Sequence, residues 1–192
     1  MKATGIRIAV LCGAAALASG TMYGQTGANG QSGTSGSGSF SAHDKVFLKK
    51  SAEGNMAEIQ TAQLALQKAS SSDVKDFAQK MIDDHTKLAD TMKPIMEQAG
   101  VAAPAKLNAE DAMMDKKLSG LSGDAFDKHY IMAMVKDHHK DLKEFKMEVA
   151  STKNDEMKTT VSQGEQVIQE HVNMIEGIAQ KHGVSASHTG AM

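Results

Sequence analysis

The sequence predicts an all-helical fold, and three observations support this. Between residues 41 and 182 the chain is dominated by Ala, Met, Leu, Lys, Glu and Gln, which favour helices. β-Branched residues are sparse there, and the two-residue alternation of a strand is missing. Apolar residues recur instead at helical spacing over four long segments. We therefore expect a four-helix bundle with a single hydrophobic core, since roughly 140 residues is a common domain size.

The N-terminal residues have the pattern of a secretory signal peptide. Lys2 and Arg7 precede an apolar run that ends in Ala16-Leu17-Ala18. The run is about a dozen residues long, shorter than the ~20 that a membrane-spanning helix requires. The composition predicts a signal peptide at 1–18, a Gly/Ser-rich flexible linker at 19–40, the bundle at 41–182 and a flexible tail at 183–192. We expect an exported protein, periplasmic or secreted, with no transmembrane span in the mature chain.

Composition after removal of this signal disfavours several classes of protein. The single cysteine, Cys12, lies in the signal, so the mature chain has no disulfide and no thiolate ligand. The mature chain carries nineteen basic and twenty-three acidic residues, and the only arginine, Arg7, is lost. Nucleic-acid binding is disfavoured because it depends on clustered Lys and Arg. No Ser-His-Asp order, nucleophilic cysteine or phosphate loop is evident, so no catalytic residue is predicted.

Two short turns arrange the long helices in pairs. Helices at about 43–69 and 73–99 are separated only by Ser70-Ser71-Ser72, so they should be antiparallel neighbours. Helices at about 124–150 and 155–181 are separated by a second short turn, in which Asn154 should cap the last helix.

A longer connection, residues 101–121, joins the two pairs. Gly100 should end the second helix, and Pro94 should kink its last turns. Asn108 should begin a short helix within the connection. Two hairpins joined by one long crossover form the ferritin-like arrangement of a four-helix bundle.

Three histidines are predicted to point into the core. At 100° per residue, His85, His138 and His171 each lie at the centre of the apolar stripe of their own helix. The acidic residue before each histidine lies about 100° away, so the repeated acid–histidine pair is not one chelating unit. Glu58, on the first helix, is a weaker fourth member, because it lies on a face of small residues beside the main apolar stripe.

The four side chains should lie at one depth in the bundle. Glu58 and His85 are equally far from the turn of the first hairpin, as are His138 and His171 from the turn of the second. At a rise of 1.5 Å per residue, the two pairs lie about 20 and 25 Å from their turns in helices about 40 Å long. One carboxylate and three imidazoles could therefore meet near the middle of the core.

Two interpretations of this group remain open. The histidines could form a hydrogen-bond network with Glu58, Tyr130, backbone groups or a buried water, which would fix the register of the helices. Alternatively, Glu58 and the three imidazoles could bind one transition-metal ion, namely zinc, copper or iron. Three methionines, each three or four residues from one of the histidines, are candidate soft ligands that would favour Cu(I), although methionine at this spacing is more often core filling. They are Met81, Met134 and Met174.

Several ordered motifs resemble domain-of-unknown-function family 4142. They are Gly-Asn-Met-Ala-Glu-Ile at 54–59, Val-Lys-Asp-Phe-Ala at 74–78 followed by Asp84-His85, Phe126-Asp127-x-x-Tyr130 followed by Asp137-His138, and His171. The resemblance covers about 43–181. It implies an exported bacterial protein with a ferritin-like bundle, often labelled an outer membrane protein, and no established activity.

The chain departs from true ferritins at the positions that matter for iron. Di-iron bundles carry Glu-x-x-His on two helices. Here Ile82 and Ile168 stand three residues before His85 and His171, which disfavours a di-iron centre. The leading hypothesis is an exported bundle with a core His/Glu metal site, in metal handling or stress response. The alternative is a structural or protein-interaction module of the cell envelope whose histidines form only a hydrogen-bond network.

Overall fold

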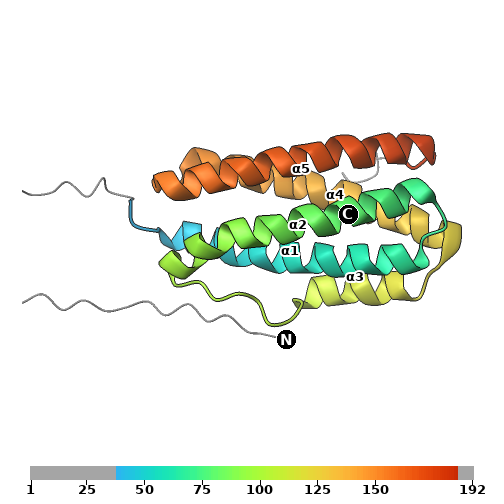
Figure 1. Ribbon diagram of the computed structural model, residues 1–192, viewed down its shortest axis with the longest axis horizontal. Coiled ribbons are helices and arrows are strands. Elements are labelled where there is room, and N and C mark those ends of the chain that lie inside the picture. Colours follow the sequence, from blue (N-terminus) through green and yellow to red (C-terminus); the bar gives the residue numbers. More distant parts are fainter. Residues whose placement is uncertain (1–37, 186–192) are drawn as a thin grey trace, which may run out of the picture. The chain divides into compact units, whose positions relative to one another are not determined.

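The computed structural model describes residues 38–185, and within this range every regular element is a helix (Figure 1). The five helices are α1 (Ala42–Lys68), α2 (Ser72–Ala99), α3 (Ala109–Ser119), α4 (Gly123–Ser151) and α5 (Asp155–Lys181). The predicted all-helical fold is confirmed, and each long helix begins and ends within one residue of its predicted bounds. The predicted signal peptide, nearly all of the predicted linker and residues 186–192 lie outside the described range.

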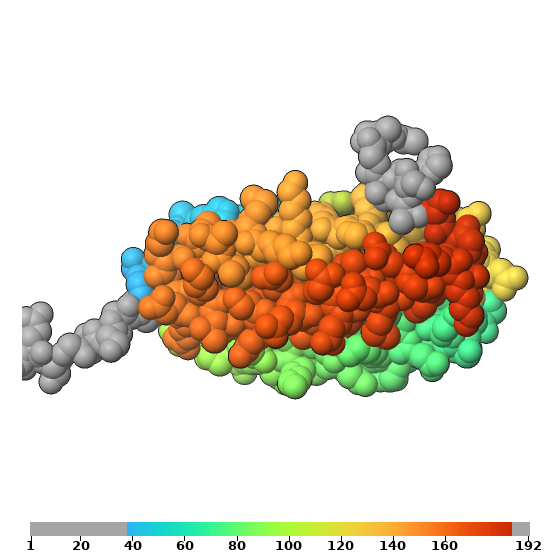
Figure 2. Space-filling view, turned by 90° about the horizontal axis from the view of Figure 1, so that it is seen from above, coloured from blue at the N-terminus to red at the C-terminus, as the bar shows by residue number. Residues whose placement is uncertain are grey.

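The long helices form two antiparallel hairpins. α1 packs along α2, and α4 packs along α5. The hairpins meet where α2 lies against α5 and α1 against α4, while α3 packs on the outside of α1 (Figure 1). The face of the bundle formed by α4 and α5, with α2 along one edge, is covered by closely fitting side chains (Figure 2). No helix among residues 38–185 has both the length and the apolar character needed to cross a membrane.

Helix ends are fixed by the residues that the sequence indicated. Asn108 and Asn154 accept hydrogen bonds from backbone N–H groups in the first turns of α3 and α5, as predicted. Gly100 ends α2 with φ of 68°, a left-handed conformation that glycine adopts at little cost. α2 remains one continuous helix through Pro94 as far as Ala99.

The carboxylate of Asp127 on α4 makes most of the hydrogen bonds that join the α1–α2 turn to the second hairpin, and Asp124 lies 2.7 Å from the Ser70 hydroxyl. The backbone N–H groups of Ser70 and Ser71 donate to Asp127 at 3.1 and 2.8 Å, and the Ser70 hydroxyl donates to it at 2.6 Å. Asp127 is only 2% exposed. Hydrogen bonds to a buried charged group are stronger than neutral ones, so this contact fixes one end of the two hairpins relative to each other.

The core consists of two apolar clusters separated along the helices by the three histidines. One cluster contains Phe77, Phe126 and Tyr130, and the other contains Phe47 and Phe145 among its larger members. On each helix, the residues before the histidine belong mainly to one cluster and those after it to the other. The polar group therefore interrupts an apolar interior at mid-length, as predicted.

The domain extends slightly beyond its predicted limits at both ends. Val184, predicted to lie in the tail, is buried in the first cluster, and Phe40, predicted to lie in the linker, packs against the second. The backbone oxygen of Gly38 accepts a hydrogen bond of 2.6 Å from Nδ2 of Asn154. Single apolar side chains next to Gly/Ser-rich segments gave too short a pattern to be assigned to the core.

Candidate metal centre

The structure brings His85 of α2, His138 of α4 and His171 of α5 together in the core. Their exposed fractions are 2%, 0% and 0%. The ring centroids of His85 and His171 lie 5.2 Å apart, those of His138 and His171 5.4 Å, and those of His85 and His138 6.1 Å. One potential ligand nitrogen from each ring lies within 4.8 Å of the other two. We call these three residues the histidine cluster.

Each ring of the histidine cluster has one nitrogen bonded to an oxygen outside the cluster. These contacts join Nδ1 of His85 to Oδ1 of Asn55 at 2.9 Å, Nδ1 of His138 to the backbone oxygen of Met134 at 3.0 Å, and Nε2 of His171 to Oδ2 of Asp84 at 2.8 Å. All three oxygens act as acceptors, so the nitrogen facing them must carry the hydrogen. The other nitrogen of each neutral ring then presents a lone pair.

Those other nitrogens have no hydrogen-bond partner. They are Nε2 of His85, Nε2 of His138 and Nδ1 of His171, and all three are buried. Burial lowers the pKa of each ring, assisted at His85 and His138 by the neighbouring imidazoles, and the pKa of His138 falls to about 3. The rings are therefore neutral at pH 7, which is the state in which imidazole binds metals.

Glu58 of α1 lies beside the histidine cluster and contacts two of the ring nitrogens that already have hydrogen-bond partners. Its Oε2 is 3.3 Å from Nδ1 of His85, and its Oε1 is 3.6 Å from Nδ1 of His138. These are the same ring nitrogens that bind Asn55 and Met134. Glu58 thus meets the histidines at the predicted depth, but on the side of the rings opposite to the unpartnered nitrogens.

The three methionines proposed as soft ligands do not share one environment. Met81 is fully buried and Met134 is 2% exposed, whereas Met174 is 37% exposed. Of the three candidate soft ligands, Met174 is therefore the one that lies partly at the surface rather than in the core. This residue lies three positions after His171, at an edge of the α5 stripe that faces solvent.

Sequence reasoning missed the residues that orient the rings. Asp84, about 100° from His85 around α2, reaches His171 on the other hairpin rather than its neighbour His85. Lys80 holds the same carboxylate oxygen at 2.6 Å. Asn55 stands one helical turn before Glu58, so its position toward His85 could have been inferred from the i, i+3 spacing.

A second group of polar side chains lies near one end of the bundle, away from the histidine cluster. His43 and Asp44, at the start of α1, and Glu148, near the end of α4, each offer a ligand atom within 4.8 Å of the others. We call them the carboxyl cluster. Glu148 is 0% exposed, and neither carboxyl oxygen has a hydrogen-bond partner, although Nδ1 of His43 lies 2.9 Å from Oε2. Burial, with Asp44 beside it, raises the pKa of Glu148 to about 7.

Comparison with known proteins places the chain in a family. The family model described as "Domain of unknown function (DUF4142)" matches residues 29–178, which is most of the sequence. The chain belongs to this family. The resemblance inferred from the motifs is thereby confirmed, and the family's description supplies no activity. A search of curated proteins found no match.

A solved structure shares the fold of this DUF4142 protein. It is named "putative secreted protein DUF305 from Streptomyces coelicolor" and is 12% identical in sequence. The alignment covers 79% of this chain and 98% of that chain, with a TM-score of 0.65. At such low identity the likeness shows the helical fold alone.

Proposed function

We propose that this protein is an exported helical bundle that binds one transition-metal ion through His85, His138 and His171 and serves in metal handling. The observation that carries the proposal is the set of three buried, unpartnered ring nitrogens in one cluster. A buried polar atom without a partner costs roughly 1–3 kcal/mol in mutational data. A metal ion would satisfy all three lone pairs at once.

The spacing of the rings is close to that of a mononuclear site. Three imidazoles on one tetrahedral zinc ion, with Zn–N of about 2.0–2.1 Å, would place their ring centroids roughly 5 Å apart. The observed centroid distances of 5.2–6.1 Å require only a small inward movement. Three protein ligands leave the fourth position to water or a small molecule.

The oxygen atoms behind the rings support the same proposal. Metal-binding histidines commonly donate their second N–H group to a carboxylate or a backbone carbonyl, which fixes the orientation and raises the basicity of the ring. Asp84 and Met134 supply these two kinds of acceptor, and Asn55 supplies an amide oxygen. Imidazole suits zinc, copper and iron, and the shortage of carboxylates on the inner side of the rings disfavours a di-iron centre.

Export is part of the proposal. It is supported by the charged and apolar pattern of residues 1–18 and by the Gly/Ser-rich segment that follows. A structural neighbour with the same fold is itself described as a secreted protein. A periplasmic or secreted bundle with a three-histidine site would meet metal ions outside the cytoplasm.

The alternative function is a structural or interaction module whose histidines are satisfied by a buried water. Full burial of the cluster favours it, because ordered water often satisfies such groups. A single water molecule, however, donates only two hydrogen bonds, so one of the three lone pairs would remain unpaired. This count favours a metal ion over one water molecule.

Metal binding by the untagged mature protein tests the proposal. Calorimetric titration with zinc, copper and iron should give a stoichiometry of one for at least one of them. Alanine variants of His85, His138 and His171 should each lose this binding. His139→Ala is the matched control, because this neighbouring histidine is exposed and pairs with Glu176 at 2.8 Å on the surface.

A second measurement avoids reliance on variants that unfold. X-ray absorption of the zinc-loaded wild type should show nitrogen ligands at about 2.0 Å and the scattering pattern of imidazole. Circular dichroism should report whether each variant keeps its helices. A wild-type protein that binds none of the three metals, or binds them equally well in all three folded variants, would exclude the site.

A further inference from the structure

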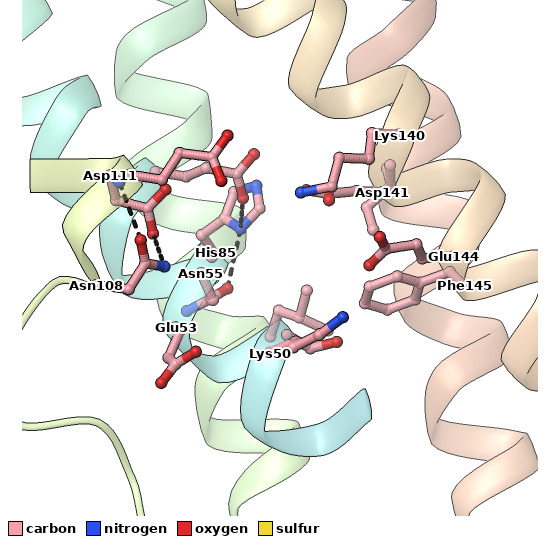
Figure 3. A pocket seen from close by; sticks show the side chains of 16 residues that line it. Lys50, Glu53, Asn55, His85, Asn108, Asp111, Lys140, Asp141, Glu144 and Phe145 are labelled. Carbon is pink, nitrogen blue, oxygen red and sulfur yellow. Dashed lines mark hydrogen bonds and ion pairs between the residues drawn. The ribbon is translucent and has the colours of Figure 1, made fainter. Parts of the chain in front are cut away.

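A cavity of about 290 Å³ leads from the surface toward the histidine cluster. It lies between α1, the start of α3 and the middle of α4, and its lining includes both His85 and Glu58. Figure 3 shows Asn108, which caps α3, and Asp111 of α3 on one side of this space and Lys140, Asp141 and Glu144 of α4 on the other. His138 and His171 do not line the cavity, and both are fully buried.

The lining of the cavity is strongly acidic. It is lined by six acidic residues and only two lysines. The acidic residues are Glu53, Glu58, Glu110, Asp111, Asp141 and Glu144, and the lysines are Lys50 and Lys140. A smaller space of about 80 Å³ is lined by some of the same residues, including Glu58, Asp111, Asp141 and Lys140, and also by Asp137 and Lys136. Burial raises the pKa of Asp141 to about 7, with Lys140 opposing the shift and Asp137 adding to it. Crowded carboxylates in a partly enclosed space attract cations and accelerate their arrival.

Glu58 connects this cavity to the histidine cluster. It is 8% exposed, and its Oε1 has no hydrogen-bond partner. The same carboxylate lines both spaces and contacts the rings of His85 and His138. A buried, unpartnered carboxyl oxygen that lines this cavity is an observation independent of the acidic lining.

We propose that this acidic cavity is the route by which a hydrated divalent cation enters, attracted by Asp111 and Asp141 and then transferred through Glu58 to the imidazoles. The inference rests on the proposed metal site and adds its access route. Six water molecules around an ion occupy roughly 200 Å³ at about 30 Å³ each, so a hydrated ion fits the larger space. The ion exchanges its waters first for Glu58, which contacts Nδ1 of His85, and then, once that ring turns to present Nε2, for the imidazole nitrogens.

The rate of zinc uptake tests the route. Stopped-flow mixing of metal-free protein with zinc and a chromophoric zinc indicator gives the association rate, and chase with excess chelator gives the dissociation rate. In Asp111→Asn/Asp141→Asn, we expect association at least about 10-fold slower and less dependent on salt. Dissociation should slow by a similar factor, because residues of a route change both rates and leave the dissociation constant unchanged.

The control removes the same charge elsewhere. Asp90→Asn/Glu97→Gln neutralises two exposed carboxylates of α2 that do not line the cavity, and it should leave both rates close to those of the wild type. A wild-type protein that takes up no zinc would overturn the proposed function and the route together. One zinc taken up at equal rates by wild type and the Asp111/Asp141 variant would overturn the route alone. A folded Asp111/Asp141 variant with no zinc binding at equilibrium would also overturn it, because these residues would then be ligands.

Discussion

The histidine cluster and Glu148 of the carboxyl cluster are both buried, and both leave polar atoms without hydrogen-bond partners. They differ in the direction in which burial shifts the pKa of their side chains. Burial lowers the pKa of the three imidazoles, so the rings stay neutral and their lone pairs remain free. At Glu148 burial raises the pKa to about 7, so this carboxyl group can take up a proton and share it with Asp44.

The comparison shows that unpartnered atoms are not equivalent indications of a binding site. A pair of carboxyl groups can satisfy itself with a proton from water. Three neutral imidazoles, each already donating outward, cannot satisfy one another, because all their inner nitrogens are acceptors. The histidine cluster is therefore the stronger candidate for a metal site, and the carboxyl cluster the weaker one.

The largest expected effect concerns the oxygen atoms behind the rings. Asp84→Ala removes the acceptor of His171 and should weaken zinc binding by about 10- to 100-fold, since loss of such an orienting partner typically costs this much. The measurement is competition with a zinc chelator at pH 7. Asp83→Ala, one residue away and exposed, should bind as tightly as the wild type. Equal weakening in both variants would mean that the loss of one negative charge near the site, rather than the loss of a ring-orienting hydrogen bond, lowers the affinity for zinc.

A smaller effect is expected at the carboxyl cluster, and it depends on pH. The pKa of Glu148 is about 7 in the folded protein against an ordinary value of 4.5, so the folded state binds more protons between these limits. The wild type should therefore lose stability as pH rises from about 4.5 to 7. Glu148→Gln should abolish this loss, gaining about 1–2 kcal/mol relative to the wild type across the range.

Urea unfolding at a series of pH values measures this difference. Burial opposes ionisation of Asp44, but its hydrogen bonds, chiefly with Ser41, lower its pKa overall. The contribution of Asp44 to the free energy of unfolding therefore changes only in more acid solution. A pH-independent difference between Glu148→Gln and the wild type would contradict proton sharing. Zinc-dependent stabilisation that disappears in Glu148→Gln would instead make the carboxyl cluster a second metal site.

The smallest effect is expected for His43. Its side chain is 64% exposed, so its polar pair with Glu148 is partly solvated. Such pairs typically contribute 0–1 kcal/mol, so His43→Ala should change the free energy of unfolding by less than about 1 kcal/mol. Zinc stoichiometry should not change. A loss of bound metal in this variant would remove the distinction between the two clusters.

The sequence predicted the helices well because local chemistry determines their ends. Ser70-Ser71-Ser72, Gly100, Asn108 and Asn154 are turn and cap residues whose preferences act over a few positions. The depth of the three histidines followed from counting residues from the hairpin turns. Both kinds of inference need only helical geometry, and both agree with the structure.

The finer arrangement of the site required the tertiary structure. A helical wheel places Met174 and Asp84 near the edges of their stripes, but it does not say which edge a neighbouring helix covers. Met174 faces solvent, whereas Asp84 reaches across to His171. The side of the rings that Glu58 contacts depends on side-chain rotamers. The acidic cavity forms because the first turn of α3, which contains Asp111, lies opposite α4. A sequence pattern does not fix how this connection between the hairpins is placed.

The contacts of Asp127 have a consequence for the rigidity of the bundle. They join the first hairpin to the second at one end, while the Asp84–His171 contact joins the hairpins at mid-length and the His43–Glu148 contact joins them at the opposite end. Because the hairpins are held together at three levels, loss of any one contact should loosen the bundle locally rather than separate its halves.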